Sequence, residues 1–208
     1  MSNQALIIID QQQGIDHPKL GDRNNPSAEI VILKLLKQWR DKSLPIIHVK
    51  HRSKDRESVF WPHQEGFDFK LGFEPQNGEF TIEKKTPCAF TNTSLLTLLQ
   101  KHNINSFVLV GVATNNSIES TARAGGNLEL DVNVIADACF TFSKHDYFGT
   151  PRTADEIHAM SLANLSEEYA NILHSSNFLC EKPNKAKHNA PKKRGQDGQQ
   201  VARPCWRR

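Results

Sequence analysis

Two polar residues that could carry out nucleophilic chemistry follow apolar runs of the sequence. Asp10 ends the run ALIIID, and Ser117 lies in the segment GVATNNSIESTAR, which follows the run SFVLV. A serine hydroxyl is a weak nucleophile unless a neighbouring base accepts its proton. A turn from a strand into a helix also presents free N–H groups, which stabilise negative charge. Ser117 is therefore a candidate nucleophile, a disabled nucleophile, or a residue that only caps a helix.

The apolar runs of the chain alternate with segments of helical periodicity. Continuous apolar runs are typical of strands buried on both faces of a parallel sheet, and they predict strands over 5–10, 45–50, 106–111 and 132–138. Apolar residues spaced three and four apart predict helices over 27–42, 93–102, 116–128 and 153–173. The last segment begins with Thr153 and Glu156, the pattern of a capping box. The alternation predicts an α/β fold with three α/β/α layers, in which a Rossmann-like, mostly parallel sheet carries helices on both faces.

The predicted strands bring three segments to one edge of the sheet. In doubly wound folds the functional site lies beyond the carboxyl ends of the strands, where Asp10, the segment after TIEKK and the turn of Ser117 all fall. The irregular stretch 51–79 contains several aromatic residues, and long loops of this kind often cover a site. Within it we predict that Phe60 and Trp61 line a substrate pocket.

Charge is distributed unevenly along the 208 residues. Residues 181–208 carry nine Lys or Arg against two acidic residues, a net charge of +7, whereas residues 1–180 carry −4. The basic segment is rich in Pro, Gly and Gln, a composition typical of disorder. We therefore predict one domain over 1–180 and a disordered basic tail over 181–208. We interpret the tail as an incidental extension; the alternative is binding to nucleic acid or a membrane surface, although aromatic residues do not interleave its charges.

The sequence also bears on the compartment of the protein. No apolar run approaches the roughly 18 residues that span a bilayer. The first ten residues, MSNQALIIID, lead almost directly into a strand, so we expect no secretory signal. The four cysteines, Cys88, Cys139, Cys180 and Cys205, show no CxxC spacing. This pattern predicts reduced thiols in a cytoplasmic protein without a membrane segment.

Three longer motifs follow one another along the chain: ALIIIDQQQG, FTIEKKTPCAFTNTSLLTLL and LVGVATNNSIESTARAGGNLELDVNVIADACF. Together, over about residues 4–174, they resemble the isochorismatase-like family of hydrolases, also called the cysteine hydrolase superfamily. By this resemblance Asp10 is the catalytic aspartate, and Gln12 is a characteristic glutamine that we assign to substrate binding. The catalytic lysine falls on Lys84, six residues before Phe90, and Ser117 stands where the family has its cysteine nucleophile.

The resemblance implies a mechanism without a cofactor. In the family an aspartate accepts the thiol proton, a lysine supports the charge balance, and the thiolate attacks a carbonyl to form an acyl-enzyme. Backbone N–H groups, here those of Ala113 and Ser117, would hold the oxyanion beside a cis peptide between Val112 and Ala113. The resemblance also implies a homo-oligomer that acts on a small-molecule substrate. No metal is expected, because His48 and His51 are not followed by the Asp-x-His pattern of related nicotinamidases.

Serine at position 117 leaves the chemistry open. A hydroxyl needs a positioned base through the transition state, and a carboxylate such as Asp10 is a poor base unless burial raises its pKa. Cys88 and Cys139 could supply the missing thiol, but their apolar neighbours favour packing roles. We predict hydrolysis of a small amide, imide or related C–N or C–O bond by Asp10, Lys84 and Ser117. The alternatives are a vinyl-ether hydrolase of the isochorismate type, in which Ser117 need not attack, and a pseudoenzyme that binds a small ligand.

Overall fold

A six-stranded parallel sheet forms the centre of the computed structural model, which describes residues 4–179. The strand order is β3-β2-β1-β4-β5-β8, and every pair of neighbouring strands is parallel. The strands are β1 (Ala5–Ile9), β2 (Ile46–His51), β3 (Phe80–Lys84), β4 (Ser106–Val112), β5 (Asp131–Phe140) and β8 (Asn171–Leu173). The basic tail predicted over 181–208 lies outside the described residues.

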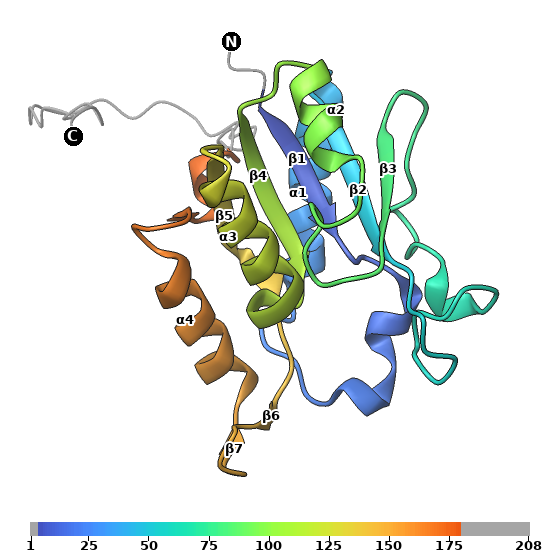
Figure 1. Ribbon diagram of the computed structural model, residues 1–208, viewed down its shortest axis with the longest axis vertical. Helices are drawn as coiled ribbons and strands as arrows, with labels where there is room; N and C mark the ends of the chain where they lie inside the picture. The colour runs from blue at the N-terminus through green and yellow to red at the C-terminus, as the bar shows by residue number, and fades with distance from the viewer. Residues whose placement is uncertain (1–3, 180–208) are drawn as a thin grey trace, which may run out of the picture.

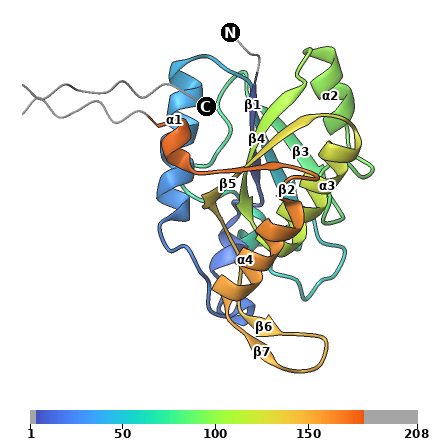
Figure 2. The same cartoon turned by 90° about the vertical axis from the view of Figure 1, so that its left-hand side faces the viewer.

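Helices cover both faces of the sheet (Figure 1 and Figure 2). One face carries α1 (Ala28–Asp41), and the opposite face carries α2 (Leu95–Lys101), α3 (Glu119–Asn127) and α4 (Ala154–Leu165). This arrangement confirms the predicted three-layer α/β/α fold. A short hairpin of β6 (Lys144–His145) and β7 (Pro151–Arg152) precedes α4 and extends beyond its N-terminal end (Figure 2). Among the described residues, no helix has the length and apolar character needed to cross a membrane.

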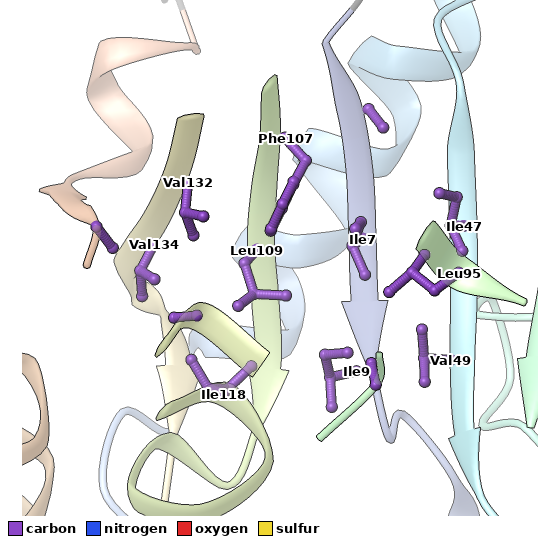
Figure 3. Close-up of a cluster of buried hydrophobic side chains, with 14 of the residues drawn as sticks. Ile7, Ile9, Ile47, Val49, Leu95, Phe107, Leu109, Ile118, Val132 and Val134 are labelled. Carbon is purple, nitrogen blue, oxygen red and sulfur yellow. The ribbon is translucent and has the colours of Figure 1, made fainter. Parts of the chain in front are cut away.

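The central strand β1 shows why two helical layers can form. All five of its residues are buried. Ile7 and Ile9 belong to the core on the side of α2 and α3 (Figure 3), whereas Leu6 and Ile8 belong to the core on the side of α1. Burial of one such aliphatic side chain contributes roughly 1.5–3 kcal/mol. The continuous apolar run therefore stabilises both layers, as the sequence predicts.

The structure differs from the prediction at the last helix and in strands that were not predicted. The helix predicted over 153–173 ends at Leu165; Glu167 then adopts a φ of 69°, and Asn171–Leu173 forms β8. A residue in the left-handed region cannot continue a right-handed helix. Strand β3 was not among the predicted strands, because polar residues interrupt its apolar ones. The capping box at the start of α4, formed by Thr153 and Glu156, is confirmed.

The end of β4 is irregular and leads into the predicted functional edge. Gly111 has a φ of 124°, and a Cβ at this position would lie 2.1 Å from the carbonyl oxygen of Ile9. Only glycine tolerates both constraints. The pairing of β4 with β5 also shifts register between Leu109 and Gly111. The following Val112–Ala113 peptide bond is cis, as the resemblance implies.

Candidate active site

Asp10, Lys84 and Ser117 meet at the carboxyl end of the sheet. Asp10 follows β1, Lys84 ends β3, and Ser117 lies in the turn after β4. The Lys84 Nζ atom lies 2.7 Å from Asp10 Oδ2 and 3.1 Å from Ser117 Oγ. The Ser117 hydroxyl donates to the same Asp10 oxygen over 2.9 Å. The three side chains therefore form a closed triangle of hydrogen bonds.

This triangle is almost completely shielded from solvent. Lys84 is 1% exposed, and Asp10 and Ser117 are each 5% exposed. A lysine at this depth requires a negative partner, which the Asp10 carboxylate supplies. The second carboxylate oxygen of Asp10, Oδ1, has no hydrogen-bond partner among the described residues, and Asp10 forms part of a pocket wall. One buried carboxylate oxygen of Asp10 is thus left with its hydrogen-bonding capacity unused.

Ser117 belongs to a five-residue π-helical turn, Thr114–Ile118, which precedes α3. Its hydroxyl bonds side chains of the triangle and does not cap the helix. The N–H of Ala113, next to the cis bond, donates to no acceptor among the described residues. Both Ala113 and Ser117 line the pocket. The Ala113 N–H is therefore placed to stabilise negative charge on a ligand in this pocket.

A pocket of about 490 Å³ lies above the triangle. Its size suits a small molecule, and its wall mixes apolar side chains with hydroxyl, amide and cationic groups. The wall is formed by Asp10, Ile15, Leu20, His51, Ser58, Phe60, Pro87, Val112, Ala113, Asn115, Asn116, Ser117, Thr141, Phe142, Ser143 and Lys144.

The structure separates the three residues that we assigned to substrate contact. Phe60 lies in the pocket wall. Gln12 is fully buried outside it, and its side chain accepts from the His51 N–H over 2.7 Å and donates to the His51 carbonyl over 3.1 Å. Trp61 faces another depression, beside Arg56. Gln12 thus supports the pocket through His51, and Trp61 lies apart because consecutive loop residues turn to different sides.

His51 is a pocket residue that the sequence analysis considered only as a metal ligand, a role it did not expect. It ends β2, pairs in register with Lys84, and its ring meets Phe60 edge-on with 5.9 Å between centroids. Burial, followed by the positive charge of Lys84, lowers the His51 pKa below its usual 6.5. A neutral imidazole can accept or donate a hydrogen bond at neutral pH. Lys144 was also missed, because it reaches the pocket from a two-residue strand without an apolar pattern.

The remaining candidates lie outside the pocket. Cys139 is fully buried, and burial raises the pKa of its thiol to about 12, so it remains protonated. Cys88 is half-buried, and its sulfur accepts the N–H of Phe90 over 3.4 Å. His48 bonds Glu79 over 2.7 Å. Within residues 4–179, no three His, Cys, Asp or Glu side chains gather in a way that could hold a metal ion.

Known proteins share this architecture. A protein from Chromobacterium violaceum, described as a hydrolase of the isochorismatase family, has a crystal structure that matches with a TM-score of 0.82 and 45% identity. The match covers 85% of this chain and 92% of that one. The isochorismatase family protein YrdC of Bacillus subtilis is 37% identical over 175 residues, which are 84% of this chain and 94% of YrdC.

A more distant relative has a named reaction. The ureidoacrylate amidohydrolase RutB of Acinetobacter baylyi is 39% identical over 77 residues, which are 36% of this chain and 31% of RutB. The sequence model of the isochorismatase domain matches residues 4–176, nearly all of the described chain. With the fold and the full-length relatives in agreement, the protein is a hydrolase of the isochorismatase-like family, the cysteine hydrolase superfamily.

Proposed function

We propose that the protein hydrolyses a small amide, imide or related C–N or C–O bond, with Asp10, Lys84 and Ser117 as its catalytic residues. One observation carries this proposal: the Ser117 hydroxyl donates to the Asp10 carboxylate and lies within hydrogen-bond distance of the Lys84 ammonium group. A nucleophile and its base within hydrogen-bond reach, with the base oriented by a third group, are the recurring parts of covalent catalysis.

The proposed reaction forms and then hydrolyses an acyl-enzyme. Ser117 Oγ attacks the substrate carbonyl carbon while its proton passes to Asp10, and the carbonyl electron pair moves to the oxygen. The N–H groups of Ala113 and Ser117 bind that oxyanion. The C–N or C–O bond then breaks, and the leaving group takes the proton from Asp10. Water attacks the ester, Asp10 accepts its proton, and the same proton returns to Ser117 Oγ as the acid product leaves.

Lys84 keeps its charge throughout this sequence. Its ammonium group stabilises the Asp10 carboxylate in the resting site and shares its hydrogen bonds between Asp10 and Ser117. The activity of RutB, an amidohydrolase according to its name, supports the choice of an amide or related bond. The pocket supplies His51, Asn115 and Lys144 for recognition of polar groups on the substrate.

A vinyl-ether hydrolase of the isochorismate type is the second candidate. The place of Asp10 in the pocket wall favours it, because a protonated Asp10 could deliver a proton to a ligand there without any attack by Ser117. A ligand-binding pseudoenzyme would keep the same pocket without turnover.

Product release from a panel of small amides, imides and isochorismate would separate these candidates. If Ser117 is the nucleophile, Ser117→Ala lowers turnover of an amide by several powers of ten, whereas Asp10→Asn abolishes it. Turnover that survives Ser117→Ala but not Asp10→Asn assigns the reaction to the second candidate. If the native protein is silent and Ser117→Cys restores activity, the pocket belongs to a pseudoenzyme. Folding of each variant is checked by circular dichroism.

We also propose that the enzyme works without a cofactor in the cytoplasm and as a homo-oligomer. Cys88 and Cys139 are both free thiols, as is usual in a reducing compartment. Tyr147 and Phe148, at the tip of the β6–β7 hairpin, are 95% and 89% exposed. Aromatic side chains that face solvent in a structured turn are common at protein interfaces.

A role in nucleic-acid binding would depend on residues 181–208, and removing them while following the salt dependence of binding would test it.

A further inference from the structure

A second buried polar cluster lies behind the turn that carries Ser117, and none of its side chains lines the pocket. It joins α4 to the first residue of the turn, Thr114. The Thr114 hydroxyl lies 2.8 Å from Nδ1 of His158, and the Thr114 carbonyl lies 3.0 Å from the hydroxyl of Ser161. Ser161 also lies 2.7 Å from the carboxylate of Glu119, at the start of α3. The cluster thus links the hydroxyl and the carbonyl of one turn residue to α4 and reaches α3.

Three members of the cluster are buried, whereas Glu119 is half-buried. Thr114 is 0% exposed, Ser161 is 1% exposed and His158 is 9% exposed. Thr114 follows Ala113 directly, and Ser117 lies three residues further along the same turn. A shift in the backbone of Thr114 would therefore displace the Ala113 N–H and the Ser117 hydroxyl together. Helix α4 packs directly against this turn.

The protonation of His158 follows from its surroundings. Burial lowers its pKa below 6.5, against the opposing effects of Asp155 on the same helix and of the Ala136 carbonyl on β5. On the other side of the ring, Nε2 lies 3.5 Å from the side-chain amide nitrogen of Asn25, which donates to the Ala136 carbonyl. The neutral ring bonds the Thr114 hydroxyl in either tautomer, because Nδ1 accepts its proton when unprotonated and donates to its oxygen when protonated.

We propose that His158 and Ser161 are positioning residues, which hold Thr114 so that the turn presents Ser117 and the Ala113 N–H in reactive geometry. The proposal rests on the function proposed above. Neither side chain lines the pocket, so each acts through Thr114. Misplacement of a reacting group by about 1 Å can lower a rate by about 100-fold. The bonds from α4 would therefore affect turnover more than substrate binding.

Substitutions at Thr114 separate positioning from packing, because two of them conserve part of the side chain. Thr114→Val keeps the volume and removes the hydroxyl, whereas Thr114→Ser keeps the hydroxyl. We expect Thr114→Val and His158→Ala to lower kcat by about 10- to 100-fold with KM changed less than about threefold. Thr114→Ser should retain most of the turnover. Equal loss of kcat in both Thr114 variants would overturn the role of the hydroxyl.

A thiol placed at position 117 provides a readout that needs no substrate. In a Ser117→Cys background, the rate of alkylation by iodoacetamide is followed from pH 5 to 9 and assigned to position 117 by peptide mass spectrometry. We expect Thr114→Val and His158→Ala to shift this pH profile or change the rate at least threefold, and Thr114→Ser to leave both unchanged. Ser175→Ala removes a hydroxyl bond outside the cluster, from a buried serine to the half-buried Asp137, and serves as the control.

The outcomes distinguish this inference from the proposed function. Altered alkylation supports the positioning role even if no compound of the panel is hydrolysed, a result that would count against the proposed function alone. The variants could instead lose thermal stability as Ser175→Ala does, with alkylation and kcat unchanged. That result would show that the cluster only stabilises the fold, and it would overturn the proposal.

Discussion

The Lys84 ammonium group lies 2.7 Å from the Asp10 carboxylate, although the two residues are 74 positions apart in the sequence. The side chain of Lys84 is fully buried and that of Asp10 is 7% exposed, so neither charge has much access to water. Removal of one partner leaves an uncompensated buried charge, which typically costs about 3–5 kcal/mol. We expect Lys84→Met to lower the free energy of unfolding, measured in urea, by about this amount.

The double variant Lys84→Met/Asp10→Asn should recover much of that loss, because it removes both charges. Both variants should be inactive. If Lys84→Met alone unfolds at the same urea concentration as the native protein, the pair does not stabilise the fold.

The Gln12 side chain connects the pocket to the end of β1. It bonds the N–H and the carbonyl of His51 and also the carbonyl of Phe67. Gln12→Met has a similar volume but removes the partner of these backbone groups, at about 1–3 kcal/mol for a group that is left buried and unpaired, as the Phe67 carbonyl would be. We expect lower stability and a higher KM, because His51 lines the pocket. Gln13→Met is the matched control, since the side chain of Gln13 makes none of these bonds.

Gly111 offers a test of the close approach between β4 and β1. A Cβ at Gly111 would meet the Ile9 carbonyl at 2.1 Å, in addition to the unfavourable φ of 124°. At Gly78 the φ is 89°, but no atom lies within 4 Å of an added Cβ. Backbone strain of this kind costs about 1–3 kcal/mol. Gly78→Ala should lose about that amount in thermal or urea unfolding, and Gly111→Ala should lose clearly more; equal losses would contradict the clash.

His48 gives a pH dependence with a defined sign. Burial, the largest effect, lowers its pKa below 6.5, and Arg40 lowers it further, against the hydrogen bond to Glu79. Below pH 6.5 the unfolded chain therefore binds a proton more readily than the folded chain does. The contribution of neutral His48 to the free energy of unfolding is fully present above pH 6.5. It is lost as the pH falls towards the lower pKa of His48 in the folded protein.

Urea unfolding between pH 5 and 7 would measure this effect. The Gln side chain of His48→Gln can still donate to Glu79 but does not titrate, so the variant should show a smaller loss of stability on acidification. Burial tends to raise the pKa of Glu79, but bonds from Arg40, the Gln76 N–H and His48 lower it to about 2. The contribution of Glu79 is lost only as the pH falls below its unfolded value of 4.5, outside this window. If the free energy of unfolding depends on pH identically in the native protein and in His48→Gln, His48 is not a source of the pH dependence.

The hairpin tip tests the proposed assembly. The Asp146 carboxylate accepts the N–H groups of Phe148 and Thr150 and the side chain of Arg152, so the turn that presents Tyr147 and Phe148 is well defined. We expect Tyr147→Ser/Phe148→Ser to shift the protein towards monomer in light scattering after size exclusion. Leu71→Ser, at a residue that is 91% exposed elsewhere, should not. A native protein that is monomeric at all concentrations would refute the assembly.

Much of the fold follows from local sequence. Strands β1, β2, β4 and β5 were predictable because continuous apolar runs are required where both faces of a sheet are covered. Strand β8 was not, since Ile172 and Leu173 extend the apolar spacing of α4 and nothing in the residue type of Glu167 marks its left-handed backbone. Boundaries that depend on one dihedral angle are difficult to predict from patterns.

The candidate site was likewise predictable only in part. The approach of Asp10 and Ser117 was predictable, because the carboxyl ends of parallel strands share an edge, whereas Lys84 was placed by the resemblance, since its strand β3 was not predicted. The triangle of bonds among the three was not predictable, and their catalytic roles remain proposals. The positions of Gln12 and Trp61 depend on how the long loop before β3 folds back over β1. The composition of the loop does not predict this path.

The Gln12 bonds also bear on how this protein could be redesigned. The segment 53–66, which contains Ser58 and Phe60 of the pocket wall, is held at both ends: the Arg52 N–H donates to the Lys84 carbonyl over 2.8 Å, and the Phe67 carbonyl accepts from Gln12. The triangle of Asp10, Lys84 and Ser117 contains no residue from this segment. A chimera that receives the corresponding loop of a relative between these two attachments would exchange ligand preference and keep its chemistry. Recognition and reaction can therefore diverge separately on this scaffold.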